Sequence, residues 1–304
     1  MLGLSVLLLT KNGADGLERL LPELFGQKSV APFEVIAIDS GSTDGTVELL
    51  AQYPLRIHHI PAETFHHART RNFAATLATG QILTFLSQDA VPASDHWLAS
   101  LIANFADPGV GAVYGRQIPR PESLAERRDT FDTIYGTQKI IKDPAHRNPL
   151  GYRFYLFSNV NAAIRRDVWE ATRFPENLKV FEDMGIAKRI LHGGWKIVYE
   201  PEAAVIHSHH HSTLGLFKRY FDLGYTLKEL KIWDAPGTKA SLSRDAWKLL
   251  KKKFTRAPAA TKKRRAGEAL EQEIAKSAGL FLGLNQALLP LAVKRRLSAY
   301  HVFG

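Results

Sequence analysis

The sequence contains no cysteine among its 304 residues, and this absence excludes two kinds of protein. Neither a small domain held by disulfides nor a zinc site built on thiolates is compatible with it. Long apolar runs are missing too. The hydrophobic start, residues 1–10, lacks a basic stretch and is too short to cross a bilayer, so we expect a buried first strand there. These absences favour a cytoplasmic protein and leave contact with a membrane surface open.

Two common phosphate-binding motifs are also missing, because there is neither a P-loop nor a Gly-x-Gly-x-x-Gly. The apolar run 33–38 is followed instead by Asp39-Ser40-Gly41-Ser42-Thr43-Asp44-Gly45-Thr46. This pattern predicts a strand that feeds a loop at its carboxyl end, where nucleotides bind in open α/β sheets. An acid in that loop can accept a hydrogen bond from a base or a ribose. An ordinary turn in which Asp44 caps a helix explains the loop, taken alone, equally well.

Strand and helix patterns alternate through the first 243 residues. Strands separated by helices predict an α/β fold with a mainly parallel sheet. Asp39 and Asp89 each follow an expected strand, so both should face one cleft at the carboxyl edge of the sheet. The expected strands are 4–10, 35–38, 56–60, 82–86 and 110–114, and the expected helices include 17–25, 68–78 and 97–105.

Positive charge is concentrated at one end of the chain. Residues 1–243 hold 26 Lys and Arg against 26 Asp and Glu, whereas residues 244–304 hold the other 14 basic and 4 acidic residues. Pro236-Gly237 lies close to this change in composition. We therefore expect one domain over residues 1–235 and a basic helical tail over residues 236–304.

Several short motifs resemble, in order and spacing, those of a family 2 glycosyltransferase with the GT-A fold. The resemblance covers about residues 3–230, and three stretches (65–72, 85–92 and 115–117) are similar to the bacterial rhamnosyltransferase branch. It implies a Rossmann-like sheet flanked by helices, with a nucleotide-sugar half over 1–115 and an acceptor half over 116–235. The motifs are Thr10 and Asn12 after the first strand, the 39–46 loop, Arg71-Asn72 on a helix, and Glu182-Asp183.

The metal motif departs from the family pattern, because Gln88 stands where an acid often lies and leaves Asp89 alone. Mg²⁺ and Mn²⁺ prefer oxygen ligands, which a donor diphosphate can supply. His207 ends an apolar strand, and the resemblance implies a metal-binding histidine there. An imidazole ligand favours Mn²⁺. We predict a divalent cation, Mg²⁺ or Mn²⁺, on Asp89 and His207, and we expect the histidines at 209–211 to be polar surface.

Glu182-Asp183 precedes a short helix with an apolar stripe. Acids at a helix N-terminus are stabilised by the helix dipole, so capping is one explanation of the pair. The resemblance implies instead that Asp183 is the general base, because a sugar hydroxyl is a poor nucleophile until its proton is removed. Trp195 is a candidate to stack on a sugar, with core packing as the alternative.

The resemblance also implies substrate contacts. Thr10, Asn12, Asp39 and Ser42 would hold the nucleoside, and Arg71 would contact the diphosphate unless it is an exposed helix arginine. The full set of predicted substrate-binding residues is Thr10, Asn12, Asp39, Ser42, His67, Arg71, Gln88, Glu182 and Trp195.

The sequence therefore predicts an inverting, metal-dependent glycosyltransferase (a hexosyltransferase). The resemblance implies dTDP-L-rhamnose as donor and a growing surface saccharide, free or lipid-linked, as acceptor. One alternative is a nucleotidyltransferase, which needs a second carboxylate near Asp89 and a Gly-rich loop of which residues 9–13 are a poor version. The other is a nucleic-acid-binding protein, but the basic charge is confined to the tail and lacks interleaved aromatic residues. We expect no nucleic-acid partner.

The tail has its own predicted partner. Two basic clusters, 251–253 and 262–265, suit an anionic membrane surface, and an apolar stripe on a helix can enter the headgroup region. This predicts a cytoplasmic enzyme peripheral to the inner face of the plasma membrane. The same stripe packing on the catalytic domain or on a second subunit is the alternative, as is a purely solvated charged face. The stripe consists of Leu280, Phe281, Leu284, Leu288 and Leu291.

Overall fold

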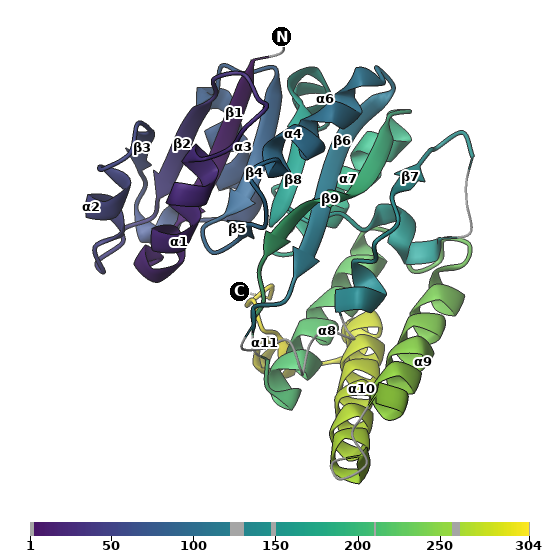
Figure 1. The fold of residues 1–304 in the computed structure, drawn as a ribbon. Helices are drawn as coiled ribbons and strands as arrows, with labels where there is room; N and C mark the ends of the chain where they lie inside the picture. Colours follow the sequence, from purple (N-terminus) through teal and green to yellow (C-terminus); the bar gives the residue numbers. More distant parts are fainter. Residues whose placement is uncertain (1–2, 122–130, 147–149, 210, 257–261, 304) are drawn as a thin grey trace.

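The first strands of the chain form a parallel sheet whose loops meet at one edge. The computed structural model describes residues 3–121, 131–146, 150–209, 211–256 and 262–303. In it β1 (Leu4–Thr10) lies between β2 (Glu34–Asp39) and β4 (Ile82–Ser87), and β3 (Arg56–His59) pairs with β2 (Figure 1). These pairings are all parallel, as expected. The flanking helices are α1 (Ala14–Phe25), α2 (Thr46–Leu50), α3 (His67–Leu77) and α4 (Trp97–Ile102).

The second half of the sheet adds the antiparallel pairings. β8 (Asn161–Arg165) runs antiparallel between β4 and β6 (Val110–Ile118), and β9 (Lys196–Ile206) runs parallel to β6. The short strands β5 (Val91–Pro92) and β7 (Ile140–Lys142) each pair antiparallel with β9. The strand order is β3-β2-β1-β4-β8-β6-β9-β5. The mixed α/β architecture predicted from the sequence is therefore confirmed.

Both faces of the sheet are covered by helices, and this explains why its strands are almost continuous apolar runs. On β1 the side chains alternate between two hydrophobic cores, with Leu7 on one face and Val6 and Leu8 on the other. The α1 helix buries Leu17, Leu20, Leu21 and Leu24 at helical spacing. α6 (Arg166–Thr172) and α7 (Glu182–His192) belong to the face opposite α1.

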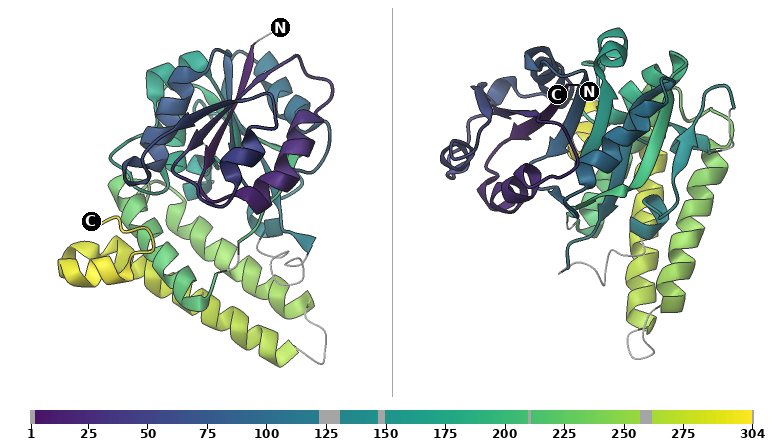
Figure 2. Two further views of the ribbon diagram at one scale, coloured as in Figure 1. Left: turned by 90° about the vertical axis from the view of Figure 1, so that its left-hand side faces the viewer. Right: turned by 45° about the horizontal axis from the view of Figure 1, so that its top comes forward.

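The helices after residue 212 pack on one another beneath the carboxyl edge of the sheet (Figures 1 and 2). Glycines allow α8 and α10 to touch backbone to backbone: a Cβ built on Gly283 would lie 2.0 Å from Phe221 O, and one on Gly279 would lie 2.2 Å from Phe217 O. The boundary predicted at residue 235 therefore falls inside one helical layer. Its members are α8 (Thr213–Glu229), α9 (Thr238–Arg256), α10 (Lys262–Leu284) and α11 (Leu291–Leu297).

The apolar stripe predicted on the tail is divided by this packing. Leu280 and Leu284 lie against α8 and its neighbours, whereas Phe281, Leu288 and Leu291 are exposed. Its alternative interpretation, packing on the rest of the chain, is thus confirmed for part of the stripe. Within the described parts of the chain, no helix combines the length and apolarity that a membrane crossing needs.

The close contact of α8 and α10 can be tested with a matched pair of glycines in α10. We expect Gly283→Ala to destabilise the protein by about 1–3 kcal/mol, because the added methyl group meets the Phe221 carbonyl. Gly267→Ala has nothing within 4 Å and should be neutral or stabilising by up to about 1 kcal/mol. Urea unfolding measures both changes. Equal effects of the two substitutions would contradict the packing described here.

Candidate active site

The buried carboxylate of Asp39 organises the loop after β2. The backbone N–H groups of Gly41 and Ser42 donate to Asp39 Oδ2 at 3.0 and 3.1 Å, and the Ser42 hydroxyl donates to Oδ1 at 2.5 Å. Thr10 Oγ1 donates to the same oxygen at 3.3 Å. Burial alone would raise the pKa of Asp39, but these hydrogen bonds outweigh it, so the pKa lies below its usual range. Asp39 and Ser42 thus shape the loop and do not line the cavity beside it.

The loops after β1 and β2 are joined by reciprocal hydrogen bonds. The Asn12 backbone N–H donates to Ser42 Oγ at 2.9 Å, and the Thr43 N–H donates to Asn12 Oδ1 at 2.9 Å. Asp44 accepts from Ala14 N at 3.2 Å and from Thr46 N at 3.1 Å. The N-cap of α2 is Gly45, without a side-chain cap, so Asp44 does not cap the helix as one interpretation held; it orders the preceding turn and also faces the cavity.

The departure at Gln88 has a physical reason. Its side-chain oxygen accepts from the Lys11 backbone N–H at 2.9 Å, and its side-chain nitrogen donates to Lys11 O at 3.0 Å. A carboxylate can make the first of these bonds but has no proton for the second. Gln88 thus ties the loop after β4 to the loop after β1, and it leaves Asp89 as the acid of this motif.

A cavity of about 740 Å³ opens at this edge of the sheet, a volume typical of small-molecule sites. Six predicted residues line it: Thr10, Asn12, His67, Arg71, Gln88 and Asp89. Further polar residues line the cavity that were not among the predicted substrate-binding or metal-binding residues: Lys11, Asp15, Arg19, Asp44, Ser87, Arg120, Asn159 and His209. Lys11 lies in the 9–13 loop and Asp44 in the 39–46 loop. Arg19 and Asn159 lie in no motif of the sequence that would indicate a binding site.

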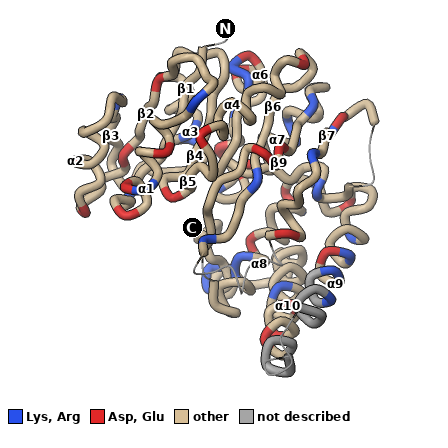
Figure 3. The backbone as a smooth tube through the Cα atoms, viewed as in Figure 1, with Lys and Arg blue, Asp and Glu red and all other residues tan. Residues whose placement is uncertain are grey.

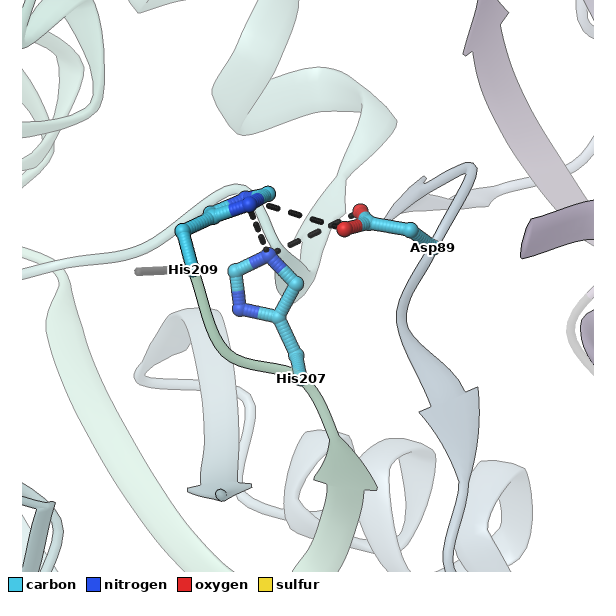
Figure 4. A group of neighbouring side chains, drawn as sticks. All are labelled: Asp89, His207 and His209. Carbon is cyan, nitrogen blue, oxygen red and sulfur yellow. Dashed lines mark hydrogen bonds and ion pairs between the residues drawn. The ribbon is translucent and has the colours of Figure 1, made fainter. Parts of the chain in front are cut away.

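Asp89, His207 and His209 form a cluster with the chemistry of a metal site (Figure 4). Their ligand atoms all lie within 4.8 Å of one another. The Nε2 atoms of the two histidines are 3.1 Å apart, and each lies 3.6 Å from an oxygen of Asp89. One carboxylate and two imidazoles suit Mn²⁺ or another first-row divalent cation better than Mg²⁺.

A hydrogen-bond chain orients His207 for this role. Gln117 Nε2 donates to the Tyr135 hydroxyl at 2.7 Å and to Ser158 Oγ at 2.9 Å, which leaves Gln117 Oε1 to accept from His207 Nδ1 at 2.9 Å. With its proton on Nδ1, His207 presents the lone pair of Nε2 to the cluster. Burial lowers the pKa of His207 to about 4, so the ring is neutral. Arg120 Nη2 lies 3.2 Å from Asp89 Oδ2 and balances its charge.

His209 is exposed, as expected of polar surface, but it also belongs to the Asp89 cluster. Its side chain is 57% exposed, yet Nε2 faces Asp89 and His207. His210 lies outside the described residues. His211 stays beside His209, with the ring centroids 6.3 Å apart. The position of His209 beside Asp89 depends on the path of the chain after β9, which composition alone does not reveal.

Glu182 and Asp183 are adjacent acids in different electrostatic states. Glu182 Oε1 accepts from Arg71 Nη1 at 2.5 Å in a nearly covered ion pair. Asp183 lacks such a pair among the described residues and accepts from the Met184 N–H at 2.8 Å. Burial, and then the nearby charge of Glu182, raise the pKa of Asp183 to about 7. A carboxyl group tuned to neutral pH is suited to general base catalysis.

Arg71 and His67 lie where the cavity approaches these acids. Arg71 lines the cavity while it pairs with Glu182, so it is not the freely exposed helix arginine of the alternative interpretation. The half-buried His67 also lines the cavity, and burial followed by the charge of Arg71 lowers its pKa. His67 therefore presents a neutral ring there.

Trp195 is not brought to the site. It directly precedes β9, whose other end leads to His207, so the two residues lie at opposite ends of an 11-residue strand. Its side chain packs where glycine backbones leave room: a Cβ on Gly111 would lie 2.7 Å from Trp195 Cβ, and one on Gly193 would lie 2.3 Å from the indole ring. The core-packing alternative therefore describes Trp195, and no sugar contact is assigned to it.

The curled sheet, the acid after β4 and the histidines after β9 define a protein of the GT-A glycosyltransferase class. The family described as Glycosyl transferase family 2 matches residues 5–172, more than half of the chain, and the chain belongs to this family. Among solved structures, the mannosyltransferase PcManGT from Pyrobaculum calidifontis in complex with GDP-Man and Mn²⁺ has a TM-score of 0.62 at 20% identity, over 92% of this chain and 86% of that chain. Staphylococcus aureus TarS 1-349 has a TM-score of 0.55 at 16% identity, over 97% and 86%.

Curated relatives include enzymes of bacterial surface polysaccharides. The O-antigen chain rhamnosyltransferase RfbN of Salmonella typhimurium is 37% identical over 203 residues, 65% of this chain and 64% of that protein. The corresponding WbaN of Salmonella anatum is 38% identical over 204 residues, 66% of this chain and 64% of that protein. The chain thus spans slightly less than two thirds of the length of these relatives.

The metal cluster predicts a graded loss of Mn²⁺ binding. Asp89→Ala should have the largest effect, because it removes the only carboxylate of the cluster, and His207→Ala and His209→Ala should each weaken binding. Gln117→Leu should cost about 10–100-fold, because it releases the orientation of His207. Electron paramagnetic resonance of free Mn²⁺ measures each affinity. His96→Ala, a surface change beside Asp95, is the control. Unchanged affinity in Asp89→Ala and His207→Ala would refute the site.

Proposed function

We propose that the protein is an inverting, metal-dependent glycosyltransferase that moves a sugar from a nucleoside-diphosphate donor to a hydroxyl group of a saccharide acceptor. The observation that carries the proposal is that two kinds of functional group lie near each other at one edge of the sheet. A set of divalent-cation ligands lies at the cavity, and a carboxyl group with a pKa near 7 lies close by. Sugar transfer needs both functions, one for the leaving diphosphate and one for the attacking hydroxyl.

In this proposal the donor occupies the cavity. Its nucleoside lies along the loops after β1 and β2, where Thr10, Asn12 and Asp44 face the cavity. Asp39 and Ser42 contribute by holding these loops in place. Arg71 and Arg120 line the cavity nearer the acids and carry positive charge toward the donor diphosphate.

The proposed metal ligands are Asp89, His207 and His209. They fit a divalent cation because a carboxylate oxygen and two imidazole nitrogens converge, and the hydrogen bond from His207 to Gln117 fixes the ligating tautomer. When bound, such a cation neutralises the charge that develops on the departing nucleoside diphosphate. The Mn²⁺ named with the Pyrobaculum mannosyltransferase supports a cation of this kind.

Asp183 is the proposed general base. It takes the proton from the acceptor hydroxyl as the oxygen attacks the anomeric carbon from the side opposite the nucleotide. The bond from that carbon to the diphosphate oxygen breaks, and its electron pair leaves with the nucleoside diphosphate. Burial and the charge of Glu182 raise the pKa of Asp183, and Arg71 pairs with Glu182 and not with Asp183, so the carboxyl group of Asp183 remains available for the proton.

The curated relatives support a particular donor and acceptor. Both Salmonella proteins are named O-antigen chain rhamnosyltransferases. We therefore propose L-rhamnose, supplied as dTDP-L-rhamnose, as the transferred sugar, and a surface-polysaccharide precursor as the acceptor. A nucleotidyltransferase would need a second carboxylate beside Asp89, and the side chains that the described residues place within 4 Å of its carboxylate are two imidazoles and a guanidinium.

Replacing the base gives a direct test of this mechanism. Asp183→Asn should lower the rate of sugar transfer by about 10²–10⁴ while Mn²⁺-dependent binding of the nucleotide sugar survives. In the wild type the rate should rise with pH through an apparent pKa of about 7, because only the ionised carboxylate accepts the proton. Sugar-transfer kinetics across pH and calorimetry with the nucleotide sugar measure these effects. Near-normal turnover by the variant would remove Asp183 from the mechanism.

A stability measurement checks the pKa of Asp183 independently. Because its folded-state value is raised from 3.8 to about 7, the stability associated with the protonated form is present in acid and is lost as pH rises through about 7. Asp183→Asn should therefore gain stability over the wild type above that pH and not in acid. A pH-independent difference would show that the pKa is not raised.

We further propose that the helical region contacts an anionic membrane, so that the enzyme works as a peripheral protein of the inner face. The exposed residues Phe281, Leu288, Leu291 and Val293 are followed by the basic run 294–296 on α11. Of the two basic clusters, Lys251 is exposed, and the side chains of 252–253 and 262–265 lie outside the described residues. Basic charge beside exposed apolar side chains suits a headgroup region.

Vesicle co-sedimentation tests this membrane contact. Removing the tail would uncover Leu227 and Met184, so full-length variants are the appropriate material. Changing Lys251–Lys253 to Gln should weaken binding to phosphatidylglycerol-containing vesicles by roughly 1 kcal/mol for each residue near the surface. Leu288→Ser with Leu291→Ser should weaken it as well. Binding of the wild type that is indifferent to salt and lipid charge would refute the proposal.

A further inference from the structure

A second cavity, of about 370 Å³, lies in the helical layer and is lined mainly by residues of α9 and α10, which lie side by side (Figure 1). Among the described residues, it shares no lining residue with the cavity assigned to the nucleotide sugar. Its apolar walls include Ile134, Leu242, Leu280 and Leu284, together with the side chain of Trp233. Nothing in the proposed sugar transfer uses this cavity.

The charged side chains in the wall of this cavity are paired within the protein. Glu273 Oε1 accepts from Lys276 Nζ at 2.6 Å, and both side chains are buried. Asp245 Oδ2 accepts from Arg153 Nε at 2.6 Å and from the Tyr152 hydroxyl at 2.9 Å. A charged group that entered the cavity would lose its water and compete with these pairs, whereas an apolar chain gains from leaving water. The interior therefore suits an uncharged, apolar ligand.

The cavity reaches the exposed apolar face of the helical layer. Phe281 lines the cavity and is 64% exposed, and it is one of the apolar side chains proposed to contact the membrane. Lys239 also lines the cavity and is exposed, with its Nζ 5.4 Å above the Trp233 ring. Basic residues recur along the described part of α9 (Figure 3). An apolar interior with positive charge beside its opening matches the two parts of an anionic phospholipid, its acyl chain and its phosphate.

We propose that this cavity binds one acyl chain of an anionic membrane phospholipid, with the lipid phosphate beside Lys239. The inference rests on the proposed membrane contact of the helical region and concerns neither the sugar donor nor the acceptor. The acyl chain leaves the bilayer beside Phe281 and enters between α9 and α10. Its burial adds to the surface contact of Leu288 and Leu291, and it holds the helical layer in one orientation on the membrane.

Short-chain lipids below their micelle concentration test the cavity without a bilayer. Phosphatidylglycerol with two hexanoyl, heptanoyl or octanoyl chains is titrated into the full-length protein, and the fluorescence of Trp233, which lines the cavity, reports binding. Each added methylene group that enters the cavity should tighten binding by about fourfold, the gain from burying one CH₂. Glycerophosphoglycerol, the same headgroup without chains, should not bind measurably. Trp233→Phe should remove the fluorescence change.

A matched pair of substitutions on α9 locates the bound chain. Ala246→Phe fills the cavity and should weaken binding of dioctanoylphosphatidylglycerol by about tenfold or more. Ala240→Phe adds the same ring at an exposed position of α9 that does not line the cavity, and it should not weaken binding. Lys239→Gln should still bind dioctanoylphosphatidylcholine and should lose the preference for phosphatidylglycerol over it.

Vesicles identify the membrane as the source of the chain. Phosphatidylglycerol vesicles with brominated acyl chains should quench Trp233, measured as the difference between the wild type and Trp233→Phe. Ala246→Phe should abolish this quenching although the variant still co-sediments with the vesicles.

Two results would overturn the inference directly: equal binding of dioctanoylphosphatidylglycerol by the wild type and Ala246→Phe, or a wild-type affinity that does not depend on chain length. The second result needs no variant, so the test survives if Ala246→Phe does not fold. Binding of the short-chain lipids without quenching by the brominated vesicles would show a site for free amphiphiles and also overturn it. Failure of the wild type to bind a nucleotide sugar with Mn²⁺ would instead refute the glycosyltransferase function and leave the lipid results unchanged.

Discussion

The pairing of β9 with two other strands is the constraint on which the site depends. On one side the register places Gln117 and Ile118 of β6 beside Val205 and Ile206, and the His207 N–H donates to Ile118 O at 2.9 Å. On the other side Val91 of β5 pairs with Ile206. The first pairing brings Gln117 to His207, and the second brings the loop that carries Asp89 to the same point.

An irregularity in β9 makes this register possible, because β9 advances from Glu200 to Val205 while β6 advances from Gly115 to Gln117. The pairing with β9 shifts between Gly115 and Gln117, and a Cβ on Gly115 would lie 1.9 Å from Ala203 O. Only glycine permits such a close approach of the two backbones. The side chain that fixes the tautomer of His207 therefore depends on a glycine two residues away, a relation that composition does not reveal.

Local pattern was enough to predict the strands β1, β2, β3, β4 and β6, whereas β5, β7 and β8 were not predicted. The first strand was predicted with its observed bounds, because an apolar run ending at Thr10 needs no distant information. The Asp39 loop and Asp89 were correctly placed at one edge, because parallel strands share a direction. The division at residue 235 stays a prediction: the Pro-Gly pair suggested it, and Gly224, Gly279 and Gly283 lie where the helices before and after it are in contact.

Contacts between residues that are far apart in the sequence determine the features of the site that local pattern did not predict. His209 belongs to the cluster because its Nε2 lies beside Asp89 and His207, and Trp195 lies away from the site because it precedes the first residue of β9. Arg219 lies on α8, and its guanidinium lies over the rings of Phe181 and Tyr300, which are distant from it in the sequence. The proposal for Asp183 likewise depends on tertiary structure, because burial and the charge of Glu182 raise its pKa while Arg71 pairs with Glu182.

The central claim is that two histidines and one carboxylate hold a divalent cation against the donor diphosphate. Pulsed electron paramagnetic resonance of the Mn²⁺ protein with a nucleoside diphosphate measures this directly, because it detects nitrogen and phosphorus nuclei bound close to the metal. If the three residues bind the cation, the spectrum should show couplings to two histidine nitrogens, one of which His207→Ala removes, together with coupling to phosphorus. A spectrum with phosphorus coupling but no histidine nitrogen, or one that His207→Ala leaves unchanged, would contradict it.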